Sequence, residues 1–479
     1  MNRFSASGLA GVIALAVALG PSPAKAANAS LKYVDTACSI SPTEFSTWFA
    51  SGSITDNGSV TFADSVSFPL QNTKCDFYKW AHQMFLWITS PAGGSIVLDS
   101  PVFFDVNFNS GGNAVYVPNT FGKMNNAFAL RGTKPQKIQP GGQAGGGDTL
   151  LSLNDSLVYF GVHANDVYAW FNTAVSNGAL PATTPFPSSQ SELNAIVQYA
   201  AQNGATLPDA NALTMELKTA WVDAATVSNL DEYITITSVV PNYQKTSTTQ
   251  WTIDPKMPSI PKTLALVGIH VVGPVNGHPE MVWATFEHHR NAPDNDFYFE
   301  PRFTPPTPLL VPFDSSGTWT FMSNGGSRDG ALVAQMTVDG STGNINATAG
   351  NTISQNNVYR VNPWGNAPTP ASAENNSELI SLNGDIIAML TMVNDMRANY
   401  FQVGGVWTNN GSIPSSPTDS HLVGSLLLAN ATMETYHQKG SATPDMGCFG
   451  CHQSTTSTGT SHLFSPSNVP LVPPASNKQ

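Results

Sequence analysis

The run Leu264-Ala-Leu-Val-Gly-Ile-His-Val-Val272 is almost entirely apolar, and a second such run, Met281-Val-Trp-Ala-Thr-Phe-Glu-His-His289, follows it closely. Short apolar runs rich in β-branched residues are typical of buried strands. The connection 273–280 contains two glycines and two prolines, which favours a turn. We therefore expect residues 264–272 and 281–289 to form an antiparallel hairpin in the core of a sheet.

The sequence around this hairpin predicts a mixed fold. Residues 215–221 alternate in polarity and residues 233–240 are rich in β-branched side chains, so both predict strands. Helical spacing of apolar residues predicts helices at 76–89, 191–202, 379–400 and 419–440, the last with Asp419 as its N-cap. We expect an α+β fold with a large β-rich body at 27–310, a Pro-, Gly- and Asn-rich connecting region at 311–375 and a helical C-terminal segment at 376–479.

The first 26 residues have the three parts of a secretory signal peptide. These parts are a cationic start at Arg3, an apolar run at 9–20 and the small-residue ending Ala24-Lys25-Ala26. The apolar run is shorter than the roughly 20 residues that span a bilayer, and no later segment is long and apolar enough. We expect a soluble protein that is periplasmic or secreted and has no membrane span.

The composition suits an exported, turn-rich protein. Charged residues make up 11% of the chain, against about 25% in typical soluble proteins. The formal net charge is −12, and removal of Arg3 and Lys25 with the signal peptide makes it −14. This acidic balance disfavours nucleic acid and anionic membranes as partners and suits a basic partner protein. The sequence does not define an oligomeric state.

Cys448-Phe449-Gly450-Cys451-His452 is a C-x-x-C-H motif. In an exported protein this spacing indicates covalent attachment of haem c: both thiols bond the porphyrin vinyl groups, and the adjacent imidazole ligates the iron. We expect one haem, held by Cys448 and Cys451, with His452 as axial iron ligand. A thioredoxin-like redox pair shares the C-x-x-C spacing, but no βαβ pattern surrounds these cysteines.

The motif resembles the haem-attachment site of c-type cytochromes, and this resemblance covers only the five residues 448–452. The stretches 216–221 and 283–288 are similar to those of large exported single-haem proteins. The resemblance implies haem binding and electron transfer with a redox partner protein, and it assigns no activity to the large body.

The motif does not define the second axial ligand. Residues 453–479 contain no methionine, the usual downstream ligand in the small cytochromes that this motif resembles. We rank four candidates, His288, His270, Met433 and His462, in that order, because the 264–289 hairpin would present a rigid ligand. Each has a structural alternative, since a buried histidine is usually satisfied by a backbone partner and a buried methionine usually fills the core.

Two further classes of function stay open. One is a haem enzyme of peroxidase or oxygenase type, in which Glu287, His288 or Arg290 serves an open distal haem face as acid, base or charge stabiliser. The other is a ligand-binding or sensory protein whose β body recognises a ligand. The chain contains neither an H-E-x-x-H zinc signature nor a G-x-S-x-G nucleophile elbow.

The two remaining cysteines, Cys38 and Cys75, are expected to form a disulfide. The motif accounts for the other two thiols, and an oxidising compartment favours pairing of those that remain. The bridge would close a loop of about 38 residues and could stabilise the protein by a few kcal/mol.

Overall fold

The computed structural model describes residues 38–70, 73–119, 148–301, 307–438 and 447–471. The predicted signal peptide at 1–26 lies outside these residues. Among the residues described, no helix is long and apolar enough to cross a membrane.

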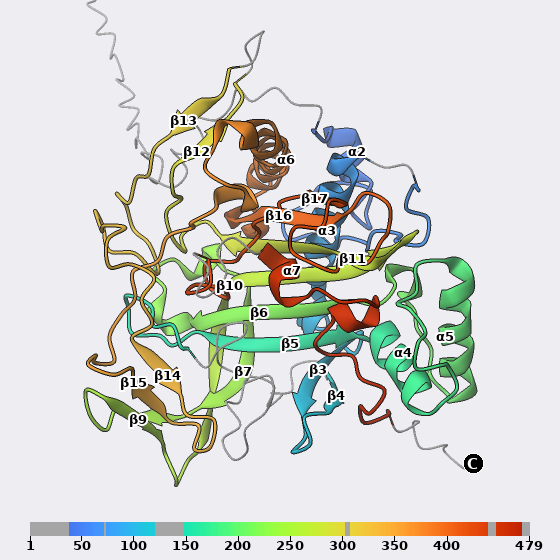
Figure 1. Ribbon diagram of the computed structural model, residues 1–479, viewed down its shortest axis with the longest axis horizontal. Helices are drawn as coiled ribbons and strands as arrows, with labels where there is room; N and C mark the ends of the chain where they lie inside the picture. Colours follow the sequence, from blue (N-terminus) through green and yellow to red (C-terminus); the bar gives the residue numbers. More distant parts are fainter. Residues whose placement is uncertain (1–37, 71–72, 120–147, 302–306, 439–446, 472–479) are drawn as a thin grey trace, which may run out of the picture.

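A nine-stranded sheet forms the centre of the molecule, and its main strands run across Figure 1. Its order is β17-β16-β11-β10-β6-β5-β3-β4, with β7 pairing β10 outside this path, and every pairing is antiparallel. The strands are β3 (Phe103–Phe108), β4 (Ala114–Pro118), β5 (Tyr159–Asn165), β6 (Glu216–Asp223), β7 (Thr235–Pro241), β10 (Ser259–Val275), β11 (His278–His288), β16 (Tyr400–Thr408) and β17 (Leu422–Gly424).

The predicted hairpin is confirmed and supplies the two longest strands, β10 and β11. The turn between them is tighter than expected because Gly277 adopts a φ of 77°, a left-handed conformation that favours glycine. The strands predicted at 215–221 and 233–240 are β6 and β7. The prediction of an α+β, β-rich fold is therefore confirmed.

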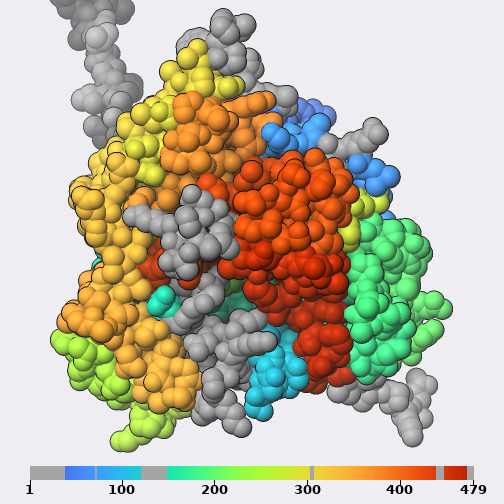
Figure 2. Space-filling view, viewed as in Figure 1, coloured from blue at the N-terminus to red at the C-terminus, as the bar shows by residue number. Residues whose placement is uncertain are grey.

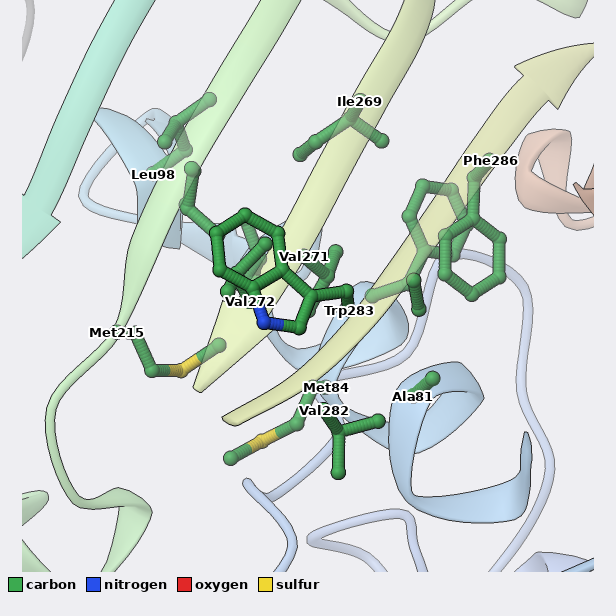
Figure 3. Packing of buried hydrophobic residues seen from close by; sticks show 14 of the residues in the cluster. Ala81, Met84, Leu98, Met215, Ile269, Val271, Val272, Val282, Trp283 and Phe286 are labelled. Atoms are coloured by element: carbon green, nitrogen blue, oxygen red, sulfur yellow. The ribbon is translucent and has the colours of Figure 1, made fainter. Parts of the chain in front are cut away.

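The helix α3 (Lys74–Ile88) covers one face of the sheet, behind β11 in Figure 1. It begins with a capping box between Thr73 and Asp76, close to the predicted start at residue 76. Its buried face packs on every second residue of β11, as Figure 3 shows for Val282 beside Ala81 and Met84.

Residues on the opposite face of β11, including Trp283, point toward the C-terminal segment. That segment contains α7 (Gly447–Cys451), which lies in front of the central strands in Figure 1. At one end of the sheet, α4 (Asp166–Ser176) and α5 (Gln190–Gln202) pack together, the second of them as predicted at 191–202.

The predicted connecting region at 311–375 contains more regular structure than expected. It contributes β14 (Met336–Val338) and β15 (Ile345–Ala347) to a four-stranded sheet with β9 (Gln250–Ile253) and β8 (Tyr243–Gln244). A further strand, β13 (Leu309–Val311), pairs with β12 (Phe297–Phe299). Strands of three residues are too short to stand out as alternating patterns in the sequence.

The predicted helical character of 376–479 is correct only in part. The helix α6 (Ala373–Met392) matches most of the helix predicted at 379–400, but β16 and β17 belong to the central sheet. The helix predicted at 419–440 is wrong: its described part contains β17 and turns. Polar contacts dock this segment on the sheet: the Asn430 side chain donates to Thr285 Oγ1 and the Ala431 amide donates to Glu287 Oε1.

The predicted disulfide is present. Cys38 and Cys75 are bonded, with their Cα atoms 5.1 Å apart. The bridge ties the residues before α2 (Pro42–Ser46) to the first turn of α3. It therefore anchors the start of the described chain to a helix that covers the central sheet.

Candidate functional site

The C-x-x-C-H residues form one helical turn, α7, anchored on the sheet through Phe449. The Phe449 side chain is buried, and its ring lies edge-on to Trp283 at a centroid distance of 5.7 Å. Gly447 has a φ of 52°, and a Cβ atom there would lie 2.2 Å from the Leu426 carbonyl oxygen. Glycine is therefore required where the chain enters the turn.

His452 is held in a defined tautomer. Its Nδ1 lies 2.7 Å from the Thr460 carbonyl oxygen, and because a carbonyl only accepts, Nδ1 carries the proton. Nε2 is thereby left as the unprotonated nitrogen, the form that binds a metal. Burial, with the neighbouring His462, lowers the pKa of His452 to about 3, so the imidazole is neutral at physiological pH. The ring packs against Trp283 at 4.3 Å between centroids.

Cys448 and Cys451 are both free thiols. Cys448 is half-buried, and among the described residues its sulfur has one weak polar contact, 4.0 Å to the Leu428 carbonyl oxygen. Cys451 is exposed. Burial raises the pKa of both thiols, with a further contribution from the Glu434 carboxylate. Figure 2 shows the red C-terminal residues at the surface beside the green α4–α5 region.

Beneath this turn lie three charged or titratable side chains: Lys218 and His270 on the sheet, and Glu434 on a segment that packs against it. His270 on β10 pairs in register with Lys218 on β6 and with Thr285 on β11. Thr285 and Trp283 are two residues apart and so share this face. His270 Nε2 lies 3.0 Å from Oε1 of Glu434, whose other oxygen accepts from the Asn430 amide at 2.8 Å.

Electrostatic interactions link these groups to the motif. The Glu434 charge raises the pKa of both thiols, Lys218 acts in the opposite sense on Cys451, and His270 lowers the pKa of His452. Burial alone would raise the pKa of Glu434, but His270 and Lys218 bring it down to about 2. Burial lowers the pKa of Lys218.

A glycine in β10 allows the segment carrying Glu434 to approach the sheet. A Cβ atom on Gly268 would lie 2.5 Å from Thr432 Oγ1 and 2.9 Å from the Asn430 side-chain amide. The backbone can come this close only because Gly268 has no side chain.

Of the four predicted distal candidates, His270 lies on the sheet face beneath the motif. His288, ranked first, lies on the opposite face of β11, because neighbouring residues of a strand alternate. It is fully buried, stacks on Tyr233 at 3.8 Å between centroids, and its Nε2 bonds the Glu232 carbonyl oxygen at 3.1 Å. This is the structural role that we considered for a buried histidine.

Met433 and His462 also have other roles. Met433 is fully buried in a separate hydrophobic cluster and fills the core. His462 stacks on His452 with ring centroids 4.2 Å apart. In this arrangement His462 packs directly against the predicted iron ligand.

The acid–base residues that we considered for a haem enzyme are engaged in structural contacts. Glu287 is fully buried and bonded to Arg360 and to the Ala431 amide. Arg290 pairs with Glu232 through two hydrogen bonds of 2.6 and 3.0 Å. These residues hold the end of β11 in place and do not converge on the motif.

The residues at the motif fit a covalently bound haem. Two free thiols lie on one helical turn, and the following imidazole is neutral with Nδ1 satisfied. Within the described ranges, no three His, Cys, Asp or Glu side chains are grouped to hold a metal ion. An iron that receives its in-plane ligands from a porphyrin needs only one or two from the protein.

Lys218 and Glu434 were not among the site residues predicted from the sequence. A lysine in the middle of a predicted strand was the available signal for Lys218, because charged residues are rarely buried without a partner. Glu434 gave no such signal, since the segment around it was expected to be helical.

No family model matches the chain, and no significant match to it is found among the curated proteins or the solved structures. The arrangement of the described residues is therefore the basis for any functional assignment.

A buried carboxylic acid fastens the residues after the motif to the sheet. Ser461 donates to Glu216 on β6 and lies 2.8 Å from the Tyr168 hydroxyl. Burial raises the pKa of Glu216 from 4.5 to about 7, so the folded protein favours the neutral acid. Ionisation of Glu216 therefore disfavours the folded state.

This predicts a loss of stability as pH rises. The folded protein binds more protons than the unfolded chain between pH 4.5 and about 7, so the free energy of unfolding should fall across this window by about 3 kcal/mol from this group. Glu216→Gln, which mimics the neutral acid, should remove that part of the decrease. Urea denaturation of both proteins at pH 5 and pH 8 measures it. An equal decrease in both proteins would contradict the assignment.

Proposed function

We propose that the protein is an exported c-type haem protein that carries one covalently bound haem and acts in electron transfer. One observation carries this proposal: the two free thiols of α7 and the neutral imidazole of His452 share one turn of chain, with Nδ1 of His452 held by Thr460. When bound, the haem supplies one-electron chemistry between ferric and ferrous iron.

The chain's own residues would hold and insulate that group. Cys448 and Cys451 would form the thioether bonds and His452 would ligate the iron through Nε2. Trp283 packs against the His452 ring and excludes water from that side. Cys451 is exposed, so an attached haem would have an edge near the surface, which suits electron exchange with a partner. The net charge of −12 favours a basic partner.

A second candidate is a haem-dependent oxidoreductase, supported by the pair His270 and Glu434 on the same sheet face. A histidine hydrogen-bonded to a carboxylate can act as a general acid or base. In that case His270 would serve a ligand bound at an open iron position and would not ligate the iron itself.

The absorption spectrum of the exported protein tests the proposal. We expect haem colour that survives acid–acetone extraction of the denatured protein, because thioether bonds are not extractable. Complete extraction of the pigment would rule the proposal out. Carbon monoxide then separates the two candidates. A low-spin spectrum that is indifferent to the gas supports electron transfer, and rapid binding supports the oxidoreductase.

A further inference from the structure

The contact between His270 and Glu434 defines which nitrogen of His270 is available. The carboxylate of Glu434 only accepts hydrogen bonds, so the 3.0 Å contact requires a proton on His270 Nε2. In the neutral imidazole, Nδ1 is then the unprotonated nitrogen. Metal-ligating and catalytic histidines commonly donate their other N–H to a carboxylate in this way, which fixes the tautomer and raises the basicity of the free nitrogen.

Glu434 is itself firmly positioned. Its second oxygen accepts from the backbone N–H of Asn430. The side-chain amide of Asn430 donates to Thr285 Oγ1 at 2.8 Å and to the Phe286 carbonyl oxygen at 3.1 Å. The absence of a side chain at Gly268 lets this segment lie directly on β10. The carboxylate is therefore attached to the same sheet that carries His270.

Lys218 lies opposite His270 on the neighbouring strand. Burial would raise the pKa of Glu434, and the contact with His270 and, after it, the charge of Lys218 lower that pKa. The geometry of the contact, with Oε1 of Glu434 3.0 Å from His270 Nε2, makes Glu434 the acceptor.

We infer that Glu434 is a positioning residue for the haem site: it fixes the orientation and tautomer of His270, the histidine on the sheet face beneath the motif, and leaves Nδ1 as the nitrogen that could serve a bound haem. This inference rests on the proposed function, because it assumes an attached haem. It extends that proposal by assigning the orientation of His270 to a residue 164 positions away in the chain.

The test uses the full exported protein with its haem attached. Glu434→Gln and Glu434→Asp are compared with His270→Ala by absorption spectrum, carbon monoxide affinity and midpoint potential. Loss of an outer carboxylate partner typically changes metal-site affinities by about 10- to 100-fold. We expect both Glu434 variants to shift the absorption spectrum and midpoint potential in the same direction as His270→Ala. If the wild type binds carbon monoxide, its affinity should change by about 10-fold or more.

The aspartate variant separates positioning from charge. It keeps the negative charge but is one methylene shorter, so a positioning role predicts that it resembles Glu434→Gln. If Glu434→Asp resembles the wild type while Glu434→Gln does not, charge alone matters and the inference is wrong. Asp419→Asn is the matched control, because Asp419 contacts His421 at 2.9 Å in an exposed pair, and it should change none of the three readouts.

The outcomes distinguish the inference from the proposed function. If His270→Ala alters the spectrum and neither Glu434 variant does, the inference fails and the haem assignment stands. If all three variants match the wild type, His270 does not serve the haem, and the inference fails with it. If the wild-type protein carries no covalent haem, the proposed function fails. Thermal unfolding of each variant verifies that it is folded.

Discussion

Replacing Cys448 and Cys451 together by serine is expected to abolish covalent haem attachment completely. Each thiol is free and can form one thioether bond, and the two lie on the same turn of α7. Either single variant should keep one bond and a reduced yield of haem protein. The yield of non-extractable haem per exported protein, measured by absorbance, gives the result.

The double variant should still fold. Neither thiol is in a disulfide, and the only described polar contact of the Cys448 sulfur is the weak one to Leu428. The buried Phe449 is retained and keeps the turn on the sheet. Cys38→Ser with Cys75→Ser is the matched control, since it removes the disulfide but should leave haem attachment intact. Full covalent haem in the Cys448 and Cys451 double variant would contradict the assignment.

Arg360→Met is expected to destabilise the protein by about 3–5 kcal/mol, because it leaves the buried carboxylate of Glu287 without its cation. The side chains of Glu287 and Arg360 are 0% and 4% exposed, and Nε of Arg360 lies 3.0 Å from the carboxylate. Arg360 also donates to the Ala292 carbonyl oxygen at 2.7 Å and to Asp294 at 2.8 Å. Urea denaturation of variant and wild type measures the loss.

Arg328→Met provides the comparison. Arg328 pairs with Asp296 at a similar distance, 2.9 Å, but the two side chains are 42% and 38% exposed. Solvent screening limits such a surface pair to about 0–1 kcal/mol. The two arginine variants should therefore differ clearly in stability. If they lose the same amount, burial of the Glu287 pair does not have the energetic effect that we assign to it.

Periodic elements of the fold could be predicted from the sequence. The hairpin of β10 and β11 and the helix α3 have patterns that depend only on local alternation or helical spacing. The helix expected at 419–440 failed because its apolar residues face different neighbours. Leu422 is in an edge strand, Leu426 is exposed and Met433 fills a separate cluster. Contacts with the sheet determine the structure of this segment, and such contacts leave no local pattern in the sequence.

The same distinction applies to the candidate site. The C-x-x-C-H motif is local and could be read directly, whereas the pairing of His270 with Glu434 depends on the docking of a turn onto a distant strand. The choice among histidines also depended on strand faces. His270 and His288 were known to lie in one hairpin, but only the packing of α7 shows which face of that hairpin it covers.

The most direct test of the haem assignment is mass spectrometry of the peptide that contains residues 447–452, prepared without reduction from the exported wild-type protein. We predict that this peptide carries one haem bonded through the sulfurs of both Cys448 and Cys451. Recovery of the peptide from correctly exported protein with two alkylatable thiols, or with a disulfide between these cysteines, would contradict it.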